Sequence, residues 1–281
     1  MFSKPLISAE HLLALQRAGE PVTLIDVRFD LADVDAGRNA WRAGHLPGSL
    51  YWHLDTDLSR ARTGRNGRHP LPERGDFART LGRAGIGPQS RVVTLDAQGG
   101  VYAARAWWAL RWMGHDEVAV LDGGVSAWLA AGGAMSTDAV APGAASPYPE
   151  RAALVPTTDA AALAASLGSA RLIDARAPER FRGDVEPLDT QAGHIPGALN
   201  RFFKDNLDAG GRFKPADRLR EEFAALLGDH GPQGVVHSCG SGVTACHNLL
   251  AMEYTGLMGS ALYPGSWSEW SSDPTRPIAR G

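Results

Sequence analysis

The sequence predicts an α/β fold of two tandem domains, each a mostly parallel sheet flanked by helices. Three observations lead to this prediction. A set of segments occurs twice in the same order, short apolar runs alternate with longer helical patterns, and a glycine-rich turn joins one apolar run to a helix. Such alternation is typical of βα units around a parallel sheet.

The internal repeat contains four pairs of segments, and repeats of this kind indicate duplicated structural units. The pairs are Leu24–Arg28 with Leu172–Arg176, Gly44–Leu50 with Gly193–Leu199, Arg91–Asp96 with Gly234–Cys239, and Asp122–Trp128 with Pro264–Trp270. A stretch rich in Ala, Pro, Gly and Ser separates the two copies and has no sustained period. We therefore predict a first domain over 1–138, a linker over 139–150 and a second domain over 151–281.

The elements of each copy follow from capping residues and from the period of the apolar residues. In the first copy we expect a helix over 9–18 capped by Ser8, strands over 22–27, 92–95 and 118–121, and helices over 76–84 and 102–113. In the second we expect a helix over 160–167 capped by Thr158 or Asp159, a strand over 171–174, a helix over 217–227, a strand at Val235 and a helix from Thr244.

The composition is that of an ordinary globular protein, with 44% hydrophobic and 21% charged residues and a formal net charge of −3. The arginines are spread along the chain, so we expect no nucleic-acid partner. No apolar run reaches membrane-spanning length and the first residues lack a signal-peptide core, so we expect a cytoplasmic protein with no membrane partner. The histidines show no ligand spacing, so we predict no metal site.

The turn after Val235 and Val236 carries Cys239, followed by Gly240 and Gly242. A strand, a glycine-rich turn and a helix direct backbone N–H groups and the positive end of a helix dipole at one point. We therefore expect Cys239 to be a reactive thiolate at the carboxyl end of a strand. The alternative is a small buried hydrophobe. The only other cysteine, Cys246, lies close by, and we expect no disulfide.

The first copy has Asp96 at the position equivalent to Cys239. A carboxylate cannot perform nucleophilic sulfur chemistry, so the first domain is predicted to be catalytically inactive. We expect it to supply one wall of a cleft.

The motifs Leu-Ile-Asp-x-Arg and Gly-His-[Leu/Ile]-Pro-Gly in both copies, with Cys239–Ala245 and Gly265–Trp270, resemble those of the tandem-domain rhodaneses. These are the thiosulfate and 3-mercaptopyruvate sulfurtransferases. The resemblance implies that Cys239 takes a sulfur from a small-molecule donor, forms a persulfide and passes the sulfur to cyanide or a thiol, with a thioredoxin-like reductant as a further partner. No cofactor is implied. The amides of Gly240, Gly242, Val243, Thr244 and Ala245 would hold the persulfide charge, although Thr244 also suits a helix N-cap.

The donor is inferred from charged residues. The resemblance implies basic side chains after the cysteine in thiosulfate enzymes, whereas Gly240–Gly242 is neutral and favours 3-mercaptopyruvate over thiosulfate. Arg180 matches the family arginine that binds the donor, and a surface salt bridge is the alternative. A second arginine is expected in Glu-Pro-Arg, but this chain has Leu188 there, which removes one carboxylate contact of the mercaptopyruvate enzymes. Arg182 is a candidate to compensate.

A proton relay is also implied by the resemblance. The family pairs a loop serine with a histidine and an aspartate of the first domain, and Ser241, His69 and Asp55 are the matching residues. The relay would protonate the leaving enolate. The alternative for His69 is a solvated histidine beside a turn.

Two other functions remain as alternatives. A cysteine-dependent phosphatase would use a thiolate in a similar loop, but it needs an arginine six residues after the cysteine, where this chain has Ala245. A non-catalytic binding or sensor module of this fold would be expected to lack Cys239.

Overall fold

The computed structural model describes residues 2, 4–141, 143 and 146–281, so positions 142, 144 and 145 of the predicted linker lie outside the described residues. The chain divides into two compact units. Unit 1 comprises Met1–Arg60, Pro72–Leu154 and Ala209–Phe213; unit 2 comprises Ala61–Leu71, Val155–Asp208 and Lys214–Gly281. Ala61–Leu71 is thus grouped with the second half of the chain and Ala209–Phe213 with the first half, and the domain limits 1–138 and 151–281 stay a prediction.

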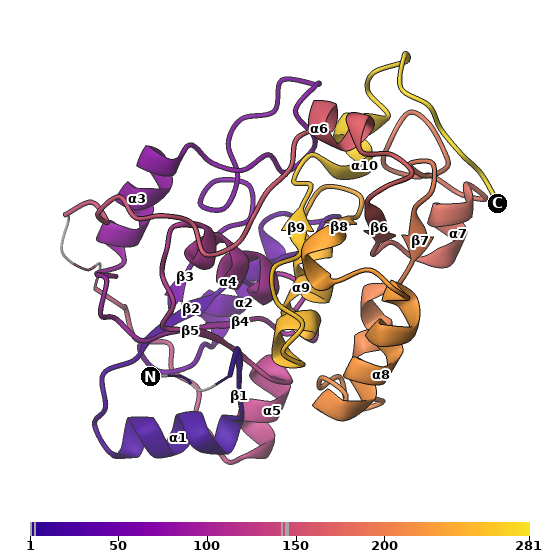
Figure 1. Cartoon of the computed structure of the whole chain (residues 1–281). Helices are drawn as coiled ribbons and strands as arrows, with labels where there is room; N and C mark the ends of the chain where they lie inside the picture. Colours follow the sequence, from indigo (N-terminus) through magenta and orange to yellow (C-terminus); the bar gives the residue numbers. More distant parts are fainter. Residues whose placement is uncertain (1, 3, 142, 144–145) are drawn as a thin grey trace. The chain divides into compact units, whose positions relative to one another are not determined.

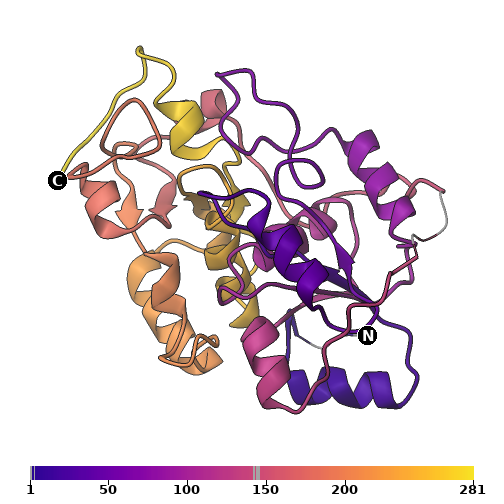
Figure 2. The same cartoon turned by 180° about the vertical axis from the view of Figure 1, so that it is seen from behind.

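Unit 1 contains a five-stranded parallel sheet in the order β1-β5-β4-β2-β3, with α1 and α5 side by side beneath it in Figure 1 and again in Figure 2. Its elements are β1 (Leu6–Ile7), α1 (Ala9–Arg17), β2 (Thr23–Asp26), α2 (Ala36–Ala43), β3 (Leu50–Tyr51), α3 (Arg74–Arg83), β4 (Val92–Leu95), α4 (Ala103–Trp112), β5 (Val118–Leu121) and α5 (Gly124–Ala130).

Unit 2 contains a four-stranded parallel sheet in the order β7-β6-β8-β9, and α9 packs against β8 and α8 (Figure 1). Its elements are α6 (Ala160–Ala165), β6 (Arg171–Asp174), α7 (Pro178–Arg182), β7 (Leu199–Asn200), η1 (Phe203–Asn206), α8 (Ala216–Leu227), η2 (Pro232–Gly234), β8 (Val235–Ser238), α9 (Ala245–Tyr254), β9 (Ala261–Leu262) and α10 (Ser266–Trp270). The predicted fold class is therefore confirmed in both units.

The longer elements form where apolar period and capping predict them. Every residue of β4, β5 and β8 is buried, as expected for central strands of parallel sheets. Ser8 caps α1 by accepting the His11 N–H at 3.2 Å, and Asp159, one of the two predicted caps, caps α6 by accepting the Ala162 N–H at 2.8 Å. The short elements β1, β3, β7, β9, α2, α5, α7 and α10 were not predicted.

The repeated Asp-x-Arg motif is a buried ion pair that connects a strand end to a turn. In unit 2, Asp174 accepts hydrogen bonds from Arg176, whose Nη2 also donates to the Gly193 carbonyl at 2.8 Å. In unit 1, Asp26 and Arg28 form the same pair. Burial raises the pKa of Asp26, and its hydrogen bond to Arg28 opposes that rise. Each motif therefore links the end of a strand to the turn that contains Gly44 or Gly193.

Candidate active site

Cys239 directly follows β8, a central strand of the unit 2 sheet, and its side chain is buried. Its amide donates to Ser266 Oγ at 3.0 Å, and its carbonyl accepts the Trp267 N–H at 2.9 Å. The sulfur in turn accepts the Gly242 N–H at 3.1 Å. The cysteine is thus held through its backbone, with an amide of the following turn directed at its sulfur.

Gly242 is required by the shape of this turn. It has a φ of +75°, and a Cβ at this position would lie 2.3 Å from the Pro264 carbonyl oxygen. Only glycine combines a left-handed conformation with so close a backbone contact. The turn therefore keeps the geometry that directs the Gly242 amide at the sulfur.

The rest of the turn presents further amides at the start of α9. Among the described residues, the N–H groups of Ser241, Val243, Thr244 and Ala245 donate no hydrogen bond. Thr244 is the N-cap of α9, yet its side chain forms no capping bond. Unsatisfied amides at a helix N-terminus favour a bound anion. The turn after Cys239 can therefore bind a negative charge.

Unit 1 shows what the equivalent turn does with an anion. The Asp96 carboxylate, which is fully buried, accepts the N–H groups of Gln98, Gly100, Tyr102 and Ala103 at 2.8 to 3.0 Å. These donors lie two, four, six and seven residues after Asp96. In unit 1 the turn thus already contains its own carboxylate.

Ser266 adopts a backbone conformation that is rare for residues other than glycine. Its φ is +53°, and its counterpart in the first copy is Gly124, with a φ of +54°. The Ser266 hydroxyl accepts the Cys239 N–H and donates to the Tyr263 carbonyl at 2.9 Å. A strained serine in place of the glycine therefore satisfies the buried amide of Cys239.

Arg180 and Arg176 provide positive charge beside the turn. Arg180, on α7, donates from Nη2 to both oxygens of Glu186 at 2.7 and 2.9 Å. Burial disfavours the charged form of Arg176, but Asp174, Glu186 and Cys239 outweigh that effect and raise its pKa. The Arg176 guanidinium also lies over the Trp267 ring, with its Cζ 4.9 Å from the ring centroid. Both guanidinium groups are therefore fixed before a donor binds.

His69 and Ser241 lie together, as the predicted relay requires. His69 Nδ1 is 2.7 Å from Ser241 Oγ, and both side chains are buried. His69 belongs to Ala61–Leu71, the early segment included in unit 2. Asp55 belongs to unit 1, where its amide donates to His53 Nδ1 at 3.1 Å, and its role in the relay stays a prediction.

Arg182 and Leu188 lie on the surface of unit 2. Arg182 forms an ion pair with Asp184 at 2.8 Å in which both side chains are about half exposed, and Leu188 is 44% exposed. Arg182 is therefore engaged in a surface ion pair. Sequence reasoning missed Arg68, whose Nη2 would lie 2.8 Å from a Cβ at Gly240. It is one of several arginines in its loop, and no signal in the sequence distinguishes it.

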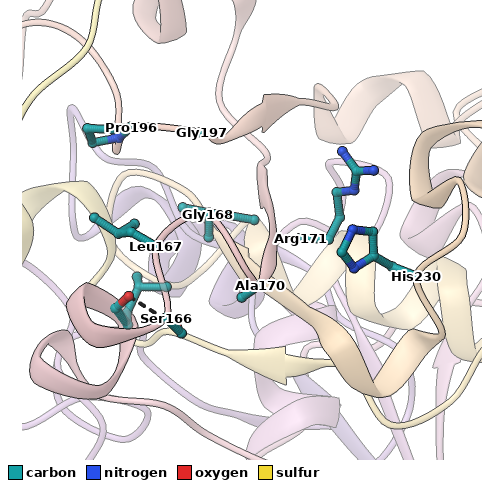
Figure 3. A pocket seen from close by; sticks show the side chains of 10 residues that line it. Ser166, Leu167, Gly168, Ala170, Arg171, Pro196, Gly197 and His230 are labelled. Atoms are coloured by element: carbon teal, nitrogen blue, oxygen red, sulfur yellow. Dashed lines mark hydrogen bonds between the residues drawn. The ribbon is translucent and has the colours of Figure 1, made fainter.

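A cavity of about 250 Å³ lies at the opposite end of the unit 2 strands (Figure 3). Arg171, the first residue of β6, and His230 face it side by side, and Gly197, which precedes β7, also lines it. Cys239 follows the last residue of the neighbouring strand β8, so the cavity lies away from the thiol.

Cys246 is fully buried, and its Sγ donates to the Gly242 carbonyl at 3.3 Å. Cys239 and Cys246 form no disulfide, as predicted. In the described part of the chain, His, Cys, Asp and Glu side chains do not gather in any group of three that could hold a metal ion. None of the helices there is long and apolar enough to cross a membrane.

Comparisons with known proteins agree with this geometry. The rhodanese-like domain model matches residues 8–131 and 158–273. A Pseudomonas aeruginosa protein named as a probable 3-mercaptopyruvate sulfurtransferase is 46% identical over the full length of both chains. Mycobacterium tuberculosis SseB, named provisionally as a thiosulfate sulfurtransferase, is 42% identical over 98% of this chain and 97% of its own. The solved 3-mercaptopyruvate sulfurtransferase from Leishmania major is 28% identical, with a TM-score of 0.84 over 95% of this chain and 74% of that one.

Proposed function

This chain belongs to the rhodanese family and is a sulfurtransferase, and on that premise we propose that Cys239 carries the transferred sulfur as a persulfide. The observation that carries the proposal is the Gly242 amide directed at the Cys239 sulfur, 3.1 Å away, at the carboxyl end of β8. A nucleophile of this kind divides one difficult transfer into two easier steps.

With 3-mercaptopyruvate as donor, the Cys239 thiolate attacks the donor sulfur and a sulfur–sulfur bond forms. The carbon–sulfur bond breaks, and its electron pair leaves with pyruvate enolate. The proton of the donor thiol ends on the enolate carbon, so the products are pyruvate and the Cys239 persulfide anion. Cyanide then attacks the outer sulfur, thiocyanate leaves and the Cys239 thiolate returns. These steps need no cofactor.

The free amides of the turn support a persulfide anion at Cys239. In unit 1 the amides that hold Asp96 lie two, four, six and seven residues further on, and the same count from Cys239 includes Ser241, Val243 and Ala245. A persulfide would place its terminal charge one sulfur beyond the Cys239 Sγ, among these donors. Donors positioned in advance stabilise developing charge without reorganisation.

The neutral turn residues Gly240–Gly242 favour 3-mercaptopyruvate, with thiosulfate as the second candidate. A small dianion gains from a cation within the turn, whereas a keto acid suits a guanidinium further out, such as Arg180. One relative of this chain is named for 3-mercaptopyruvate and another for thiosulfate, so the proposal keeps both donors. A thiol or a thioredoxin-like reductant would be the acceptor, and we keep the cytoplasm as the proposed location.

The contact between His69 and Ser241 supports a relay that moves a proton to the leaving enolate. Ser241 follows Cys239 by two residues, so its hydroxyl can serve a donor bound at the sulfur. Asp55 would orient His69 in this proposal.

A phosphatase would need a cation where Ala245 stands, at the buried start of α9. A binding module would not need the fixed sulfur. Neither alternative is favoured by a specific observation.

The test is thiocyanate production from cyanide with each donor, using the wild type, Cys239→Ser and, as a matched control, Cys246→Ser. We expect activity in the wild type and in Cys246→Ser, and none in Cys239→Ser. Hydrolysis of an aryl phosphate by a wild type inactive with both donors would refute the proposal.

A further inference from the structure

Two arginines from distant parts of the chain converge over the turn after Cys239. A Cβ at Gly240 would lie 2.8 Å from Arg68 Nη2 and 3.4 Å from Arg180 Nη1. Arg68 lies in the segment Ala61–Leu71 and Arg180 on α7, and both belong to unit 2. The residue next to the proposed nucleophile is thus covered by two guanidinium groups.

Acidic side chains hold the other edge of both guanidinium groups. Asp189 forms an ion pair with Arg68 Nη1, and its second oxygen lies 3.5 Å from Arg180 Nη2. Glu186 takes two hydrogen bonds from the same Arg180 nitrogen. Arg68 Nη2 and Arg180 Nη1 form no hydrogen bond with a described residue, and the buried Arg180 Nε also has no partner. The edges directed at Gly240 therefore keep unused donors.

The backbone of Arg68 is held in place. Its N–H donates to Ser268 Oγ at 3.0 Å. The preceding Gly67 has a φ of +81°, and a Cβ there would lie 2.9 Å from the Gly265 carbonyl oxygen. Arg68 is thus positioned next to α10, whose first residue is the strained Ser266 that accepts the Cys239 N–H.

With the Cys239 sulfur left out, the cluster of arginines and acids around Gly240 has balanced formal charges before a donor binds. The guanidinium groups of Arg68, Arg176 and Arg180 are matched by the carboxylates of Asp174, Glu186 and Asp189. A neutral cluster with free, planar N–H edges suits a flat carboxylate that accepts two parallel hydrogen bonds better than it suits a compact dianion.

We propose that Arg68 and Arg180 together bind the carboxylate of the sulfur donor. Arg68 would then take the role of the second arginine expected in the Glu-Pro-Arg motif, where this chain has Leu188. This inference rests on the proposed function, because it assigns the donor contact at the same site. It makes Arg68 a determinant of donor choice, with 2-oxo acids that carry a thiol as the preferred class.

The test compares Arg68→Ala, Arg68→Lys and the exposed control Arg65→Ala with the wild type, using 3-mercaptopyruvate and thiosulfate as probes. Removing a charged hydrogen-bond donor should raise KM for 3-mercaptopyruvate about 10- to 100-fold. The decrease in kcat/KM with thiosulfate should be smaller than the decrease with 3-mercaptopyruvate. Arg68→Lys should fall between the wild type and Arg68→Ala, and Arg65→Ala should match the wild type.

A second readout separates donor binding from a structural role. The rate at which cyanide removes sulfur from the preloaded persulfide should change less than about twofold in Arg68→Ala, since the acceptor lacks a carboxylate. If Arg68→Ala does not fold, Arg68→Lys decides by the same measurements. A KM within twofold of the wild type, or equal losses with both donors, would overturn the inference. A wild type inactive with both donors would instead refute the proposed function, and the inference with it.

Discussion

The His69 Nδ1 and Ser241 Oγ atoms lie 2.7 Å apart although 172 residues separate them in the chain. His69 is buried, so the alternative of a solvated loop histidine is wrong. The hydrogen bond joins the early segment Ala61–Leu71 to the turn that carries Cys239. A proton can therefore pass between this imidazole and the hydroxyl of Ser241, two residues after Cys239.

This contact predicts a donor-specific loss of rate. Ser241→Ala and His69→Gln should each lower kcat with 3-mercaptopyruvate about 100-fold, because its enolate must be protonated at carbon. Thiosulfate releases sulfite, which needs no such proton, so its kcat should change little. The double variant should be no slower than either single variant, since one relay is lost in each. Asp55→Asn should show the same donor dependence to a smaller degree. Equal losses with both donors would contradict the relay.

The two glycines of the turn should respond differently to alanine. Gly242→Ala should unfold more easily and lose activity, because its Cβ would meet the Pro264 carbonyl at a positive φ. The added methyl group of Gly240→Ala meets only side-chain ends, those of Arg68 and Arg180, and no backbone atom. This variant should therefore keep its stability, and displacing the guanidinium groups should raise KM for the donor. Thermal unfolding and donor kinetics on both variants check this, and a destabilised Gly240→Ala with unchanged KM would contradict it.

The hydroxyl of Ser266 should contribute more to the free energy of unfolding than its strained backbone costs. Ser266→Ala keeps the strained φ and leaves the buried Cys239 amide without an acceptor, at a cost of about 1–3 kcal/mol in the free energy of unfolding. Ser266→Gly loses the same hydrogen bond but relieves the strain, so its stability should lie between those of the wild type and Ser266→Ala. Denaturant unfolding gives the order, and an alanine variant as stable as the wild type would refute it.

Leu188→Arg should raise the preference for 3-mercaptopyruvate over thiosulfate. Leu188 lines a cavity of about 190 Å³ together with Arg68 and Asp189, so an arginine there would add a guanidinium beside the proposed donor contact. The ratio of kcat/KM for the two donors measures the effect, with Leu188→Gln as the uncharged control. An unchanged ratio would mean that the position does not face the donor.

The buried His237 predicts how stability depends on pH. Burial lowers its pKa to about 3, and its Nε2 lies 3.1 Å from the Met252 sulfur. Between that value and the ordinary pKa of about 6.5, the unfolded chain binds a proton that the folded chain does not, so acidification favours unfolding. From pH 7 to pH 5 the wild type should lose about 2 kcal/mol more stability than His237→Gln. Urea unfolding at both pH values tests this, and parallel losses would contradict it.

The duplicated fold and the turn that carries Cys239 could be predicted because their signals are local. Three strands have the bounds that the apolar runs predict: Val92–Leu95, Val118–Leu121 and Arg171–Asp174. Strands of a parallel sheet are buried on both faces, so they appear in the sequence as short apolar runs bounded by turn residues. Two-residue strands such as β1 and β7 escape prediction, because only their partners across the sheet define them.

The charged surroundings of the turn could not be predicted from spacing. Arg68 reaches Gly240 only because the segment Ala61–Leu71 is included in unit 2, and one ion pair with Asp189 decides its direction. Arg182 has the same charge and lies near Arg180 in sequence, yet it pairs with Asp184 at the surface. Tertiary contacts, rather than residue type, therefore decide which of these arginines lies near Gly240.

The most direct measurement is the mass of the peptide that contains Cys239 after one equivalent of 3-mercaptopyruvate reacts without an acceptor. We expect a gain of about 32 Da, one sulfur atom, on Cys239, and its loss when cyanide releases one equivalent of thiocyanate. An unmodified Cys239 after one equivalent of pyruvate has formed would contradict a persulfide at this residue.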